Sequence, residues 1–170
     1  MEATDTELVE QCLAGKTEAF DELIQRHQDP VFNLLMKLTG NWHEAGDLTQ
    51  EAFIRAYRKL GSYDPQFSFK NWVIAIAVNL AKNRFRSFFR RRRIEEQTSG
   101  PVESTAADPR VELVDQALAQ LPDTLRVPIV LKHMEGYSYE EIAQTLNIGV
   151  SAAKMRVARA REELVRRIEP

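Results

Sequence analysis

Polar and cationic side chains recur at helical spacing between positions 79 and 86. Asn79, Lys82, Asn83 and Arg86 follow one another at intervals of 3, 1 and 3 residues, so an α-helix places them on one face. Asparagine amides and Lys or Arg cations bind phosphate oxygens and the edges of bases. This stripe therefore predicts a contact with nucleic acid.

Aromatic residues border the polar stripe. Trp72 precedes Asn79 by two helical turns, and the loop before it contains Tyr63, Phe67 and Ser68. Aromatic rings stack on unpaired bases, and such a loop can hold a base that has left the duplex. Aromatic residues at helical spacing also occur in ordinary cores, so a structural role and a base-stacking role both stay open.

A helix-turn-helix is predicted near the C-terminus. A helix over about 139–146 is followed by Asn147-Ile148-Gly149 and by a second helix from Val150, a spacing typical of this motif. Small residues on the outer face of the second helix let its backbone approach a groove, and cations there reach guanine edges or phosphates. The candidate DNA-contacting residues are Ser151, Lys154, Met155, Arg156, Ala158 and Arg159. A helical hairpin with an ordinary polar face is the alternative.

The elements that must position these residues are predicted to be helical. Caps, prolines and apolar periodicity predict helix starts near Thr4, Thr17, Pro30, Asn41, Phe69, Leu113, Pro122, Ser138 and Val150. Pro128, inside one of these helices, is expected to kink or shorten it. Residues 95–111 are rich in Ser, Thr, Pro and acids and predict a linker. We therefore expect an all-α fold: two small helical domains, 1–94 and 112–170, joined by a flexible acidic linker, with the helix-turn-helix in the second.

The composition excludes several classes of protein. Of 170 residues, 44% are hydrophobic and only one is cysteine, which argues against a disordered chain and against an internal disulfide framework. The longest apolar run is far shorter than a membrane span, and the acidic N-terminus does not resemble a secretory signal. We expect a soluble cytoplasmic protein without membrane insertion.

The net charge of −2 conceals strong segregation. Residues 67–94 contain eight Lys or Arg and no acid, and a second basic tract spans 154–167. Two basic tracts separated by an acidic connector fit a polyanionic partner better than the total charge suggests. No metal or cofactor is expected, because the spacings of Cys12, His27, His43 and His133 match no ligand motif.

Three motifs in order carry a resemblance to a known family. The segments are Glu44–Phe53, Phe69–Asn79, and Tyr137–Ala143 with Arg156–Arg161. Together they resemble the extracytoplasmic-function (ECF) group of bacterial sigma factors. The resemblance implies a non-enzymatic initiation factor whose partners are core RNA polymerase, promoter DNA and an anti-sigma factor, with no small-molecule substrate.

The resemblance also implies roles for individual residues. The face that docks on the polymerase clamp comprises Asp47, Gln50, Glu51, Ile54 and Arg55. The minus-ten element is engaged by Tyr63, Phe67, Ser68, Trp72, Asn79, Lys82, Asn83 and Arg86, and the minus-thirty-five element by the outer face of the helix from Val150.

Two departures from the family pattern concern binding strength and specificity. Gly46 stands where an acid is usual, which predicts weaker docking on the polymerase. Ala152, Ala153 and Met155 replace frequent residues of the recognition helix, which predicts a different promoter preference.

A conventional helix-turn-helix regulator with a sensory or dimerising N-terminal domain is the alternative function. A metal protein or enzyme using the cysteine and histidines is a further alternative.

Overall fold

The computed structural model describes residues 3–95, 109–133 and 135–169, with side chains left undescribed from 85 to 95. Every regular element in this part of the chain is helical, which confirms the predicted all-α class. The elements are α1 (Asp5–Leu13), α2 (Glu18–Thr39), α3 (Trp42–Arg58), a 3₁₀ turn η1 (Leu60–Ser62), α4 (Phe69–Glu95), α5 (Pro109–Ala119), α6 (Asp123–His133), α7 (Tyr139–Leu146) and α8 (Val150–Ile168). No helix in these ranges is both long and apolar enough to cross a bilayer.

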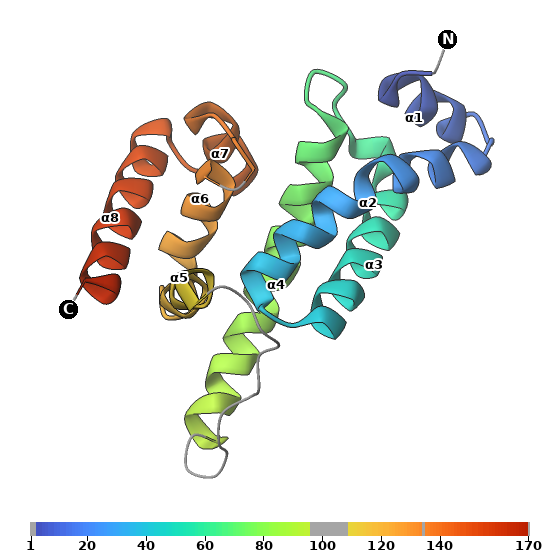
Figure 1. Ribbon diagram of the computed structural model, residues 1–170. Helices are drawn as coiled ribbons and strands as arrows, with labels where there is room; N and C mark the ends of the chain where they lie inside the picture. Colours follow the sequence, from blue (N-terminus) through green and yellow to red (C-terminus); the bar gives the residue numbers. More distant parts are fainter. Residues whose placement is uncertain (1–2, 96–108, 134, 170) are drawn as a thin grey trace.

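Helices α2, α3 and α4 pack together as the centre of the N-terminal domain (Figure 1). Asn41 begins α3 as predicted: its side chain accepts a hydrogen bond from the backbone N–H of Glu44 at 3.0 Å. The small residues Ala45, Ala52 and Ala56 are fully buried on one side of α3 and allow close approach of its neighbours. On the opposite side of α3, Asp47, Gln50 and Ile54 are exposed.

The prediction of two helices separated at Pro30 is wrong. Helix α2 continues through Pro30 from Glu18 to Thr39. Proline removes one helical N–H, a cost of about 3 kcal/mol in a helix interior. Leu23 before it and Val31 and Leu34 after it are fully buried, so one continuous helix buries more apolar surface than two shorter ones.

Helices α5 to α8 form the C-terminal domain, and α7 and α8 build the predicted helix-turn-helix. Ser138 and Glu141 form a capping box that starts α7. Asn147 ends it in the left-handed conformation, with φ of 53°, which asparagine tolerates better than most residues. Helix α6 runs on past Pro128 to His133. Helix α5 begins at Pro109, inside the segment that the sequence assigns to the linker.

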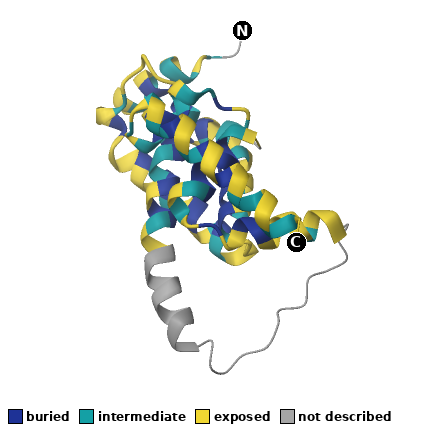
Figure 2. Cartoon of the chain, turned by 90° about the vertical axis from the view of Figure 1, so that its left-hand side faces the viewer, coloured by how far each residue is buried: buried dark blue, intermediate teal, exposed yellow. Residues whose placement is uncertain are grey.

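The two domains lie against each other. Helix α6 contacts α2, and α7 contacts α4. Buried side chains form one continuous cluster that extends through both domains (Figure 2). The helix-turn-helix is therefore docked on the N-terminal helices.

Candidate nucleic-acid interface

The polar stripe of α4 divides into an exposed part and a covered part. Asn79 and Asn83 are exposed, whereas Lys82 is half-buried. Burial lowers the pKa of Lys82, and the nearby charge of Arg156 lowers it further. Arg86 lies outside the described side chains. The two asparagines are therefore the groups of this stripe that the fold offers directly to a ligand.

Trp72 belongs to an aromatic cluster at the N-terminal end of α4. Its ring centroid lies 5.3 Å from that of Tyr63 and 5.8 Å from that of Phe69. Phe69 is fully buried, while Trp72 is half-buried. Phe69 therefore has a structural role in the core. Trp72 packs against the core with one part of its ring, and its exposed part is accessible for stacking on a base.

The loop before α4 is held in place by its own side chains. The Tyr63 hydroxyl donates a hydrogen bond to the carbonyl oxygen of Phe67 at 2.5 Å. The Ser68 Oγ accepts from the backbone N–H of Asn71 at 3.4 Å, so Ser68 helps to begin the helix. Phe67 remains 42% exposed. An exposed ring in a loop that is tied by two side-chain hydrogen bonds is suited to stacking on a base.

A groove of about 550 Å³ lies along the junction of α3 and α4. All five predicted polymerase-contacting residues line it: Asp47, Gln50, Glu51, Ile54 and Arg55. Glu51 and Arg55 form an ion pair at 2.6 Å, and Ile54 is 46% exposed. Asn83 and Arg84 of α4 line the other wall, so the predicted polymerase face adjoins the predicted DNA stripe.

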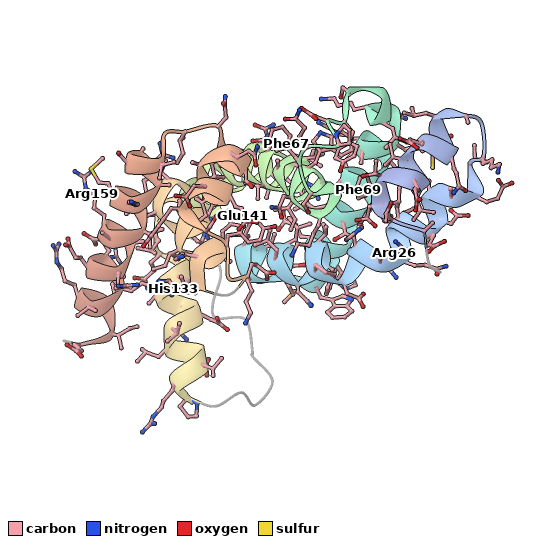
Figure 3. The ribbon with its side chains drawn as sticks, turned by 90° about the horizontal axis from the view of Figure 1, so that it is seen from above. Arg26, Phe67, Phe69, His133, Glu141 and Arg159 are labelled. Atoms are coloured by element: carbon pink, nitrogen blue, oxygen red, sulfur yellow. The ribbon has the colours of Figure 1, made fainter. Side chains whose placement is uncertain are left out.

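The outer face of α8 is open to solvent. Ser151, Lys154, Met155, Ala158 and Arg159 are exposed, and Arg159 projects away from the rest of the molecule (Figure 3). Arg156 is half-buried, close enough to α4 for its charge to act on Lys82. Arg156 is thus less accessible to DNA than the other five residues predicted for this face.

One tyrosine that the sequence analysis missed organises the cations beside α8. The ring centroid of Tyr139 lies 4.5 Å from the Lys132 ammonium and 5.8 Å from that of Lys154. Such cation–π contacts limit the freedom of both lysine side chains. An aromatic residue at the start of a helix-turn-helix, beside a basic second helix, is the signal that identifies this role.

Two of the three histidines pair with neighbouring side chains. His27 Nε2 lies 2.7 Å from a carboxylate oxygen of Asp5, and His133 Nε2 lies 2.9 Å from a guanidinium nitrogen of Arg161. No cluster of three or more His, Cys, Asp or Glu able to hold a metal occurs within the described ranges.

Comparison with known proteins identifies the family. Residues 23–93 match the profile of Sigma-70 region 2, and residues 112–164 match that of Sigma-70 region 4. The RNA polymerase sigma-H factor of Pseudomonas aeruginosa is 32% identical, over 98% of this chain and 94% of its own. The ECF RNA polymerase sigma factor SigW of Bacillus subtilis is 31% identical, over 96% of each. The chain belongs to the ECF sigma factors.

Solved structures support the assignment of this chain to the ECF sigma factors. CnrH, in complex with the cytosolic domain of CnrY, matches with a TM-score of 0.73 and 26% identity, over 95% of both chains. The sigma factor RpoE of Bartonella quintana, in complex with the anti-sigma factor NepR, matches with a TM-score of 0.67 and 26% identity, over 88% of this chain and 96% of that one.

The family assignment decides between the functions that the sequence left open. A conventional regulator does not account for the region 2 match over α2, α3 and α4. As an ECF sigma factor, the chain directs RNA polymerase to promoters.

Proposed function

We propose that this sigma factor uses three separate surfaces during initiation, one for polymerase and one for each promoter element. The division into a domain of residues 1–94, a linker of 95–111 and a domain of 112–170 underlies this proposal. The observation that carries it is the different chemistry of the three surfaces: an apolar and acidic groove wall on α3, an aromatic loop with asparagines on α4, and an exposed cationic face on α8.

Helix α8 reads duplex DNA at the minus-thirty-five element. Its exposed small residues let it enter the major groove, and Lys154 and Arg159 reach phosphates or guanine edges. Tyr139 positions the Lys154 ammonium for a phosphate contact. Met155, half exposed on the same face, supplies an apolar contact for a thymine methyl group.

The loop and α4 capture the unwound strand at the minus-ten element. Phe67 and the free surface of Trp72 stack on bases, while Tyr63 fixes the loop through its hydrogen bond to the Phe67 carbonyl. Ser68 follows Phe67 in the chain, and its side chain caps the start of α4. Asn79 and Asn83 then bind the strand along the exposed side of α4, with Lys82 and Arg86 contributing positive charge.

The outer side of α3 docks on core polymerase. Ile54 gives the apolar centre of this surface, with Asp47, Gln50, Glu51 and Arg55 around it. An exposed apolar side chain within a polar rim is the usual anatomy of a protein interface.

The protein performs no chemistry of its own and binds no cofactor in this account. It works where core polymerase works, in the cytoplasm. An anti-sigma factor is a further partner, because the two structural relatives were solved in complex, one with an anti-sigma factor and one with CnrY.

Photo-crosslinking tests the three assignments in one experiment. A photoreactive phenylalanine analogue replaces one exposed apolar residue on each surface: Ile54 (46% exposed), Phe67 (42%) or Met155 (50%). In promoter complexes with core polymerase, Ile54 is expected to crosslink to polymerase, Phe67 to the unwound strand and Met155 to upstream duplex. Leu13, 58% exposed on α1, is the matched control and is expected to crosslink to neither DNA element. Exchange of any two targets would overturn the assignment.

A further inference from the structure

Helix α1 precedes the segment that matches Sigma-70 region 2, which begins at residue 23. Leu8 and Val9 are buried in the core of the N-terminal domain and fix one side of the helix there. Helix α1 contacts η1, the turn that leads into the loop before α4, and Figure 1 shows both at the same end of the domain. The helix therefore lies beside the loop proposed to capture the unwound strand, although it supplies none of the residues proposed to touch DNA.

A polar network anchors the first turn of α1 to α2. The Arg26 guanidinium donates hydrogen bonds to the carbonyl oxygen of Ala3 at 2.7 Å and to Asp5 Oδ1 at 3.2 Å. The other carboxylate oxygen, Asp5 Oδ2, lies 2.7 Å from His27 Nε2. A carboxylate only accepts hydrogen bonds, so His27 Nε2 carries the proton and donates it. Asp5 thus binds two successive residues of α2 and fixes the orientation of the His27 ring.

The His27 ring links α1 to the aromatic cluster at the start of α4. Its centroid lies 5.5 Å from that of Phe69, and its side chain is only 14% exposed. Phe69 in turn lies 5.5 Å from Tyr63 and 5.8 Å from Trp72, measured between ring centroids. A path of direct contacts therefore runs from Asp5 through two buried rings to the tryptophan proposed to stack on a base.

The first turn of α1 also acts on Tyr63, which holds the loop through its hydrogen bond to the Phe67 carbonyl. Burial raises the pKa of the Tyr63 hydroxyl, and the negative charge of Asp5 raises it further, against a hydrogen bond from the Thr6 side chain. A hydroxyl with a raised pKa stays protonated and therefore remains a donor to the loop. Helix α1 thus influences the loop as well as the core ring beneath it.

We propose that Asp5 and His27 are positioning residues for strand capture. Asp5 holds the His27 ring, that ring supports Phe69, and Phe69 sets the position of the Trp72 ring. The inference rests on the proposed capture of the unwound strand by the loop and Trp72, and it assigns the precision of that capture to a helix outside the region 2 match. A misplacement of about 1 Å at a reacting or binding group can cost about a hundredfold in rate.

Trp72 fluorescence reports on this support in the free chain. The sequence has two tryptophans, so Trp42→Phe leaves Trp72 as the single emitter. In that background, Asp5→Ala and His27→Ala are each expected to shift the emission to longer wavelength and to increase its quenching by iodide. Asp5→Asn keeps an acceptor for the histidine N–H and is expected to restore the wild-type spectrum. Glu10→Ala, which removes an exposed acid from the same helix, is the matched control and leaves the spectrum unchanged.

The kinetics of strand opening measure the consequence in the polymerase complex. Asp5→Ala and His27→Ala are each expected to slow open-complex formation about tenfold while binding of the closed promoter complex is retained. The double variant is expected to be no slower than His27→Ala, because Asp5 acts through that ring. A variant that had only lost stability would lower the amount of active complex and leave the rate constant of opening unchanged. Fluorescence of 2-aminopurine in the minus-ten element gives this rate constant.

The outcomes separate positioning from strand capture itself. An unchanged Trp72 spectrum in both Asp5→Ala and His27→Ala, a normal opening rate in both, or multiplied defects in the double variant would overturn the positioning role. Phe67→Ala tests the loop directly. A normal opening rate in Phe67→Ala contradicts strand capture by the loop, whereas a slow rate there with normal rates in the other two variants contradicts only the role of α1.

Discussion

The site proposed for the unwound strand lies in a partly buried aromatic cluster, whereas the site proposed for duplex DNA lies on one exposed helix face. Trp72 and Tyr63 pack on Phe69 and so share their surface between core and ligand. Lys154 and Arg159 are exposed on α8 and do not form part of the core. The difference matches the ligands: an unwound base needs a rigid apolar platform, and a duplex needs reachable cations and a helix thin enough to enter its groove.

Salt dependence should distinguish duplex binding from single-strand binding most strongly. Binding of a minus-thirty-five duplex should fall about a hundredfold between 50 and 200 mM salt if about four phosphates are neutralised. Binding of a minus-ten single strand, in which stacking and amide contacts supplement the charges of Lys82 and Arg86, should fall less steeply. Fluorescence anisotropy of the polymerase complex with each labelled DNA gives both slopes, and equal slopes would break the comparison.

Removing the exposed amides tests the N-terminal site. Replacing Asn79 and Asn83 together by alanine should slow open-complex formation about thirtyfold, as expected for two lost hydrogen-bonding groups, and leave duplex binding unchanged. The measurement is the permanganate reactivity of unpaired thymines. Asn33→Ala, an exposed asparagine on α2, is the control. Unchanged strand opening in the double variant would count against a role of Asn79 and Asn83 in binding the unwound strand.

Removing one cation tests the C-terminal site. Arg159→Ala should weaken binding to the minus-thirty-five duplex about tenfold, while affinity for core polymerase is retained. Arg166→Ala, on the same helix but paired with Glu163 near its end, should have little effect. A parallel loss of polymerase affinity in Arg159→Ala would show that the residue is structural.

Gly46 should give the smallest effect. It lies inside α3 and a Cβ there meets no atom within 4 Å, so Gly46→Ala should raise the free energy of unfolding by up to about 1 kcal/mol. Gly46→Glu adds the charge usual in the family beside Asp47 and should also tighten polymerase binding. Thermal unfolding and polymerase titration of both variants separate helix stability from charge. Equal polymerase affinity for wild type and Gly46→Glu would reject the predicted weakness.

Local patterns predicted the faces of each helix well. The spacing of Asn79 and Asn83, the Ser138 and Glu141 capping box and the small outer residues of α8 all arise from residues within a few turns of one another. Helical periodicity identifies the side of each helix that faces away from the core of its own domain. It was sufficient for the helix-turn-helix and for placing the five α3 residues proposed to contact polymerase along one groove.

Contacts between distant segments escaped prediction. Pro30 with Asp29 before it has the local signature of a helix start, but burial of Leu23 and Leu34 by distant residues favours one helix. Lys82 and Arg156 fall on polar faces by periodicity, yet each is half-buried because the other domain packs nearby. Periodicity within one helix contains no information about a second domain.

The central claim is that two unlike surfaces, one for an unwound strand and one for a duplex, act together only when polymerase holds them apart. Start-site mapping tests it most directly, with sigma-free core polymerase, the purified chain and fragmented DNA from its own genome. The account predicts discrete transcript 5′ ends preceded by two short shared sequences at a fixed spacing. Arg159→Ala and the Asn79 and Asn83 double variant should each reduce the yield of these transcripts, at a different step of initiation. Absence of start-site selection, or selection governed by only one shared sequence, would contradict it.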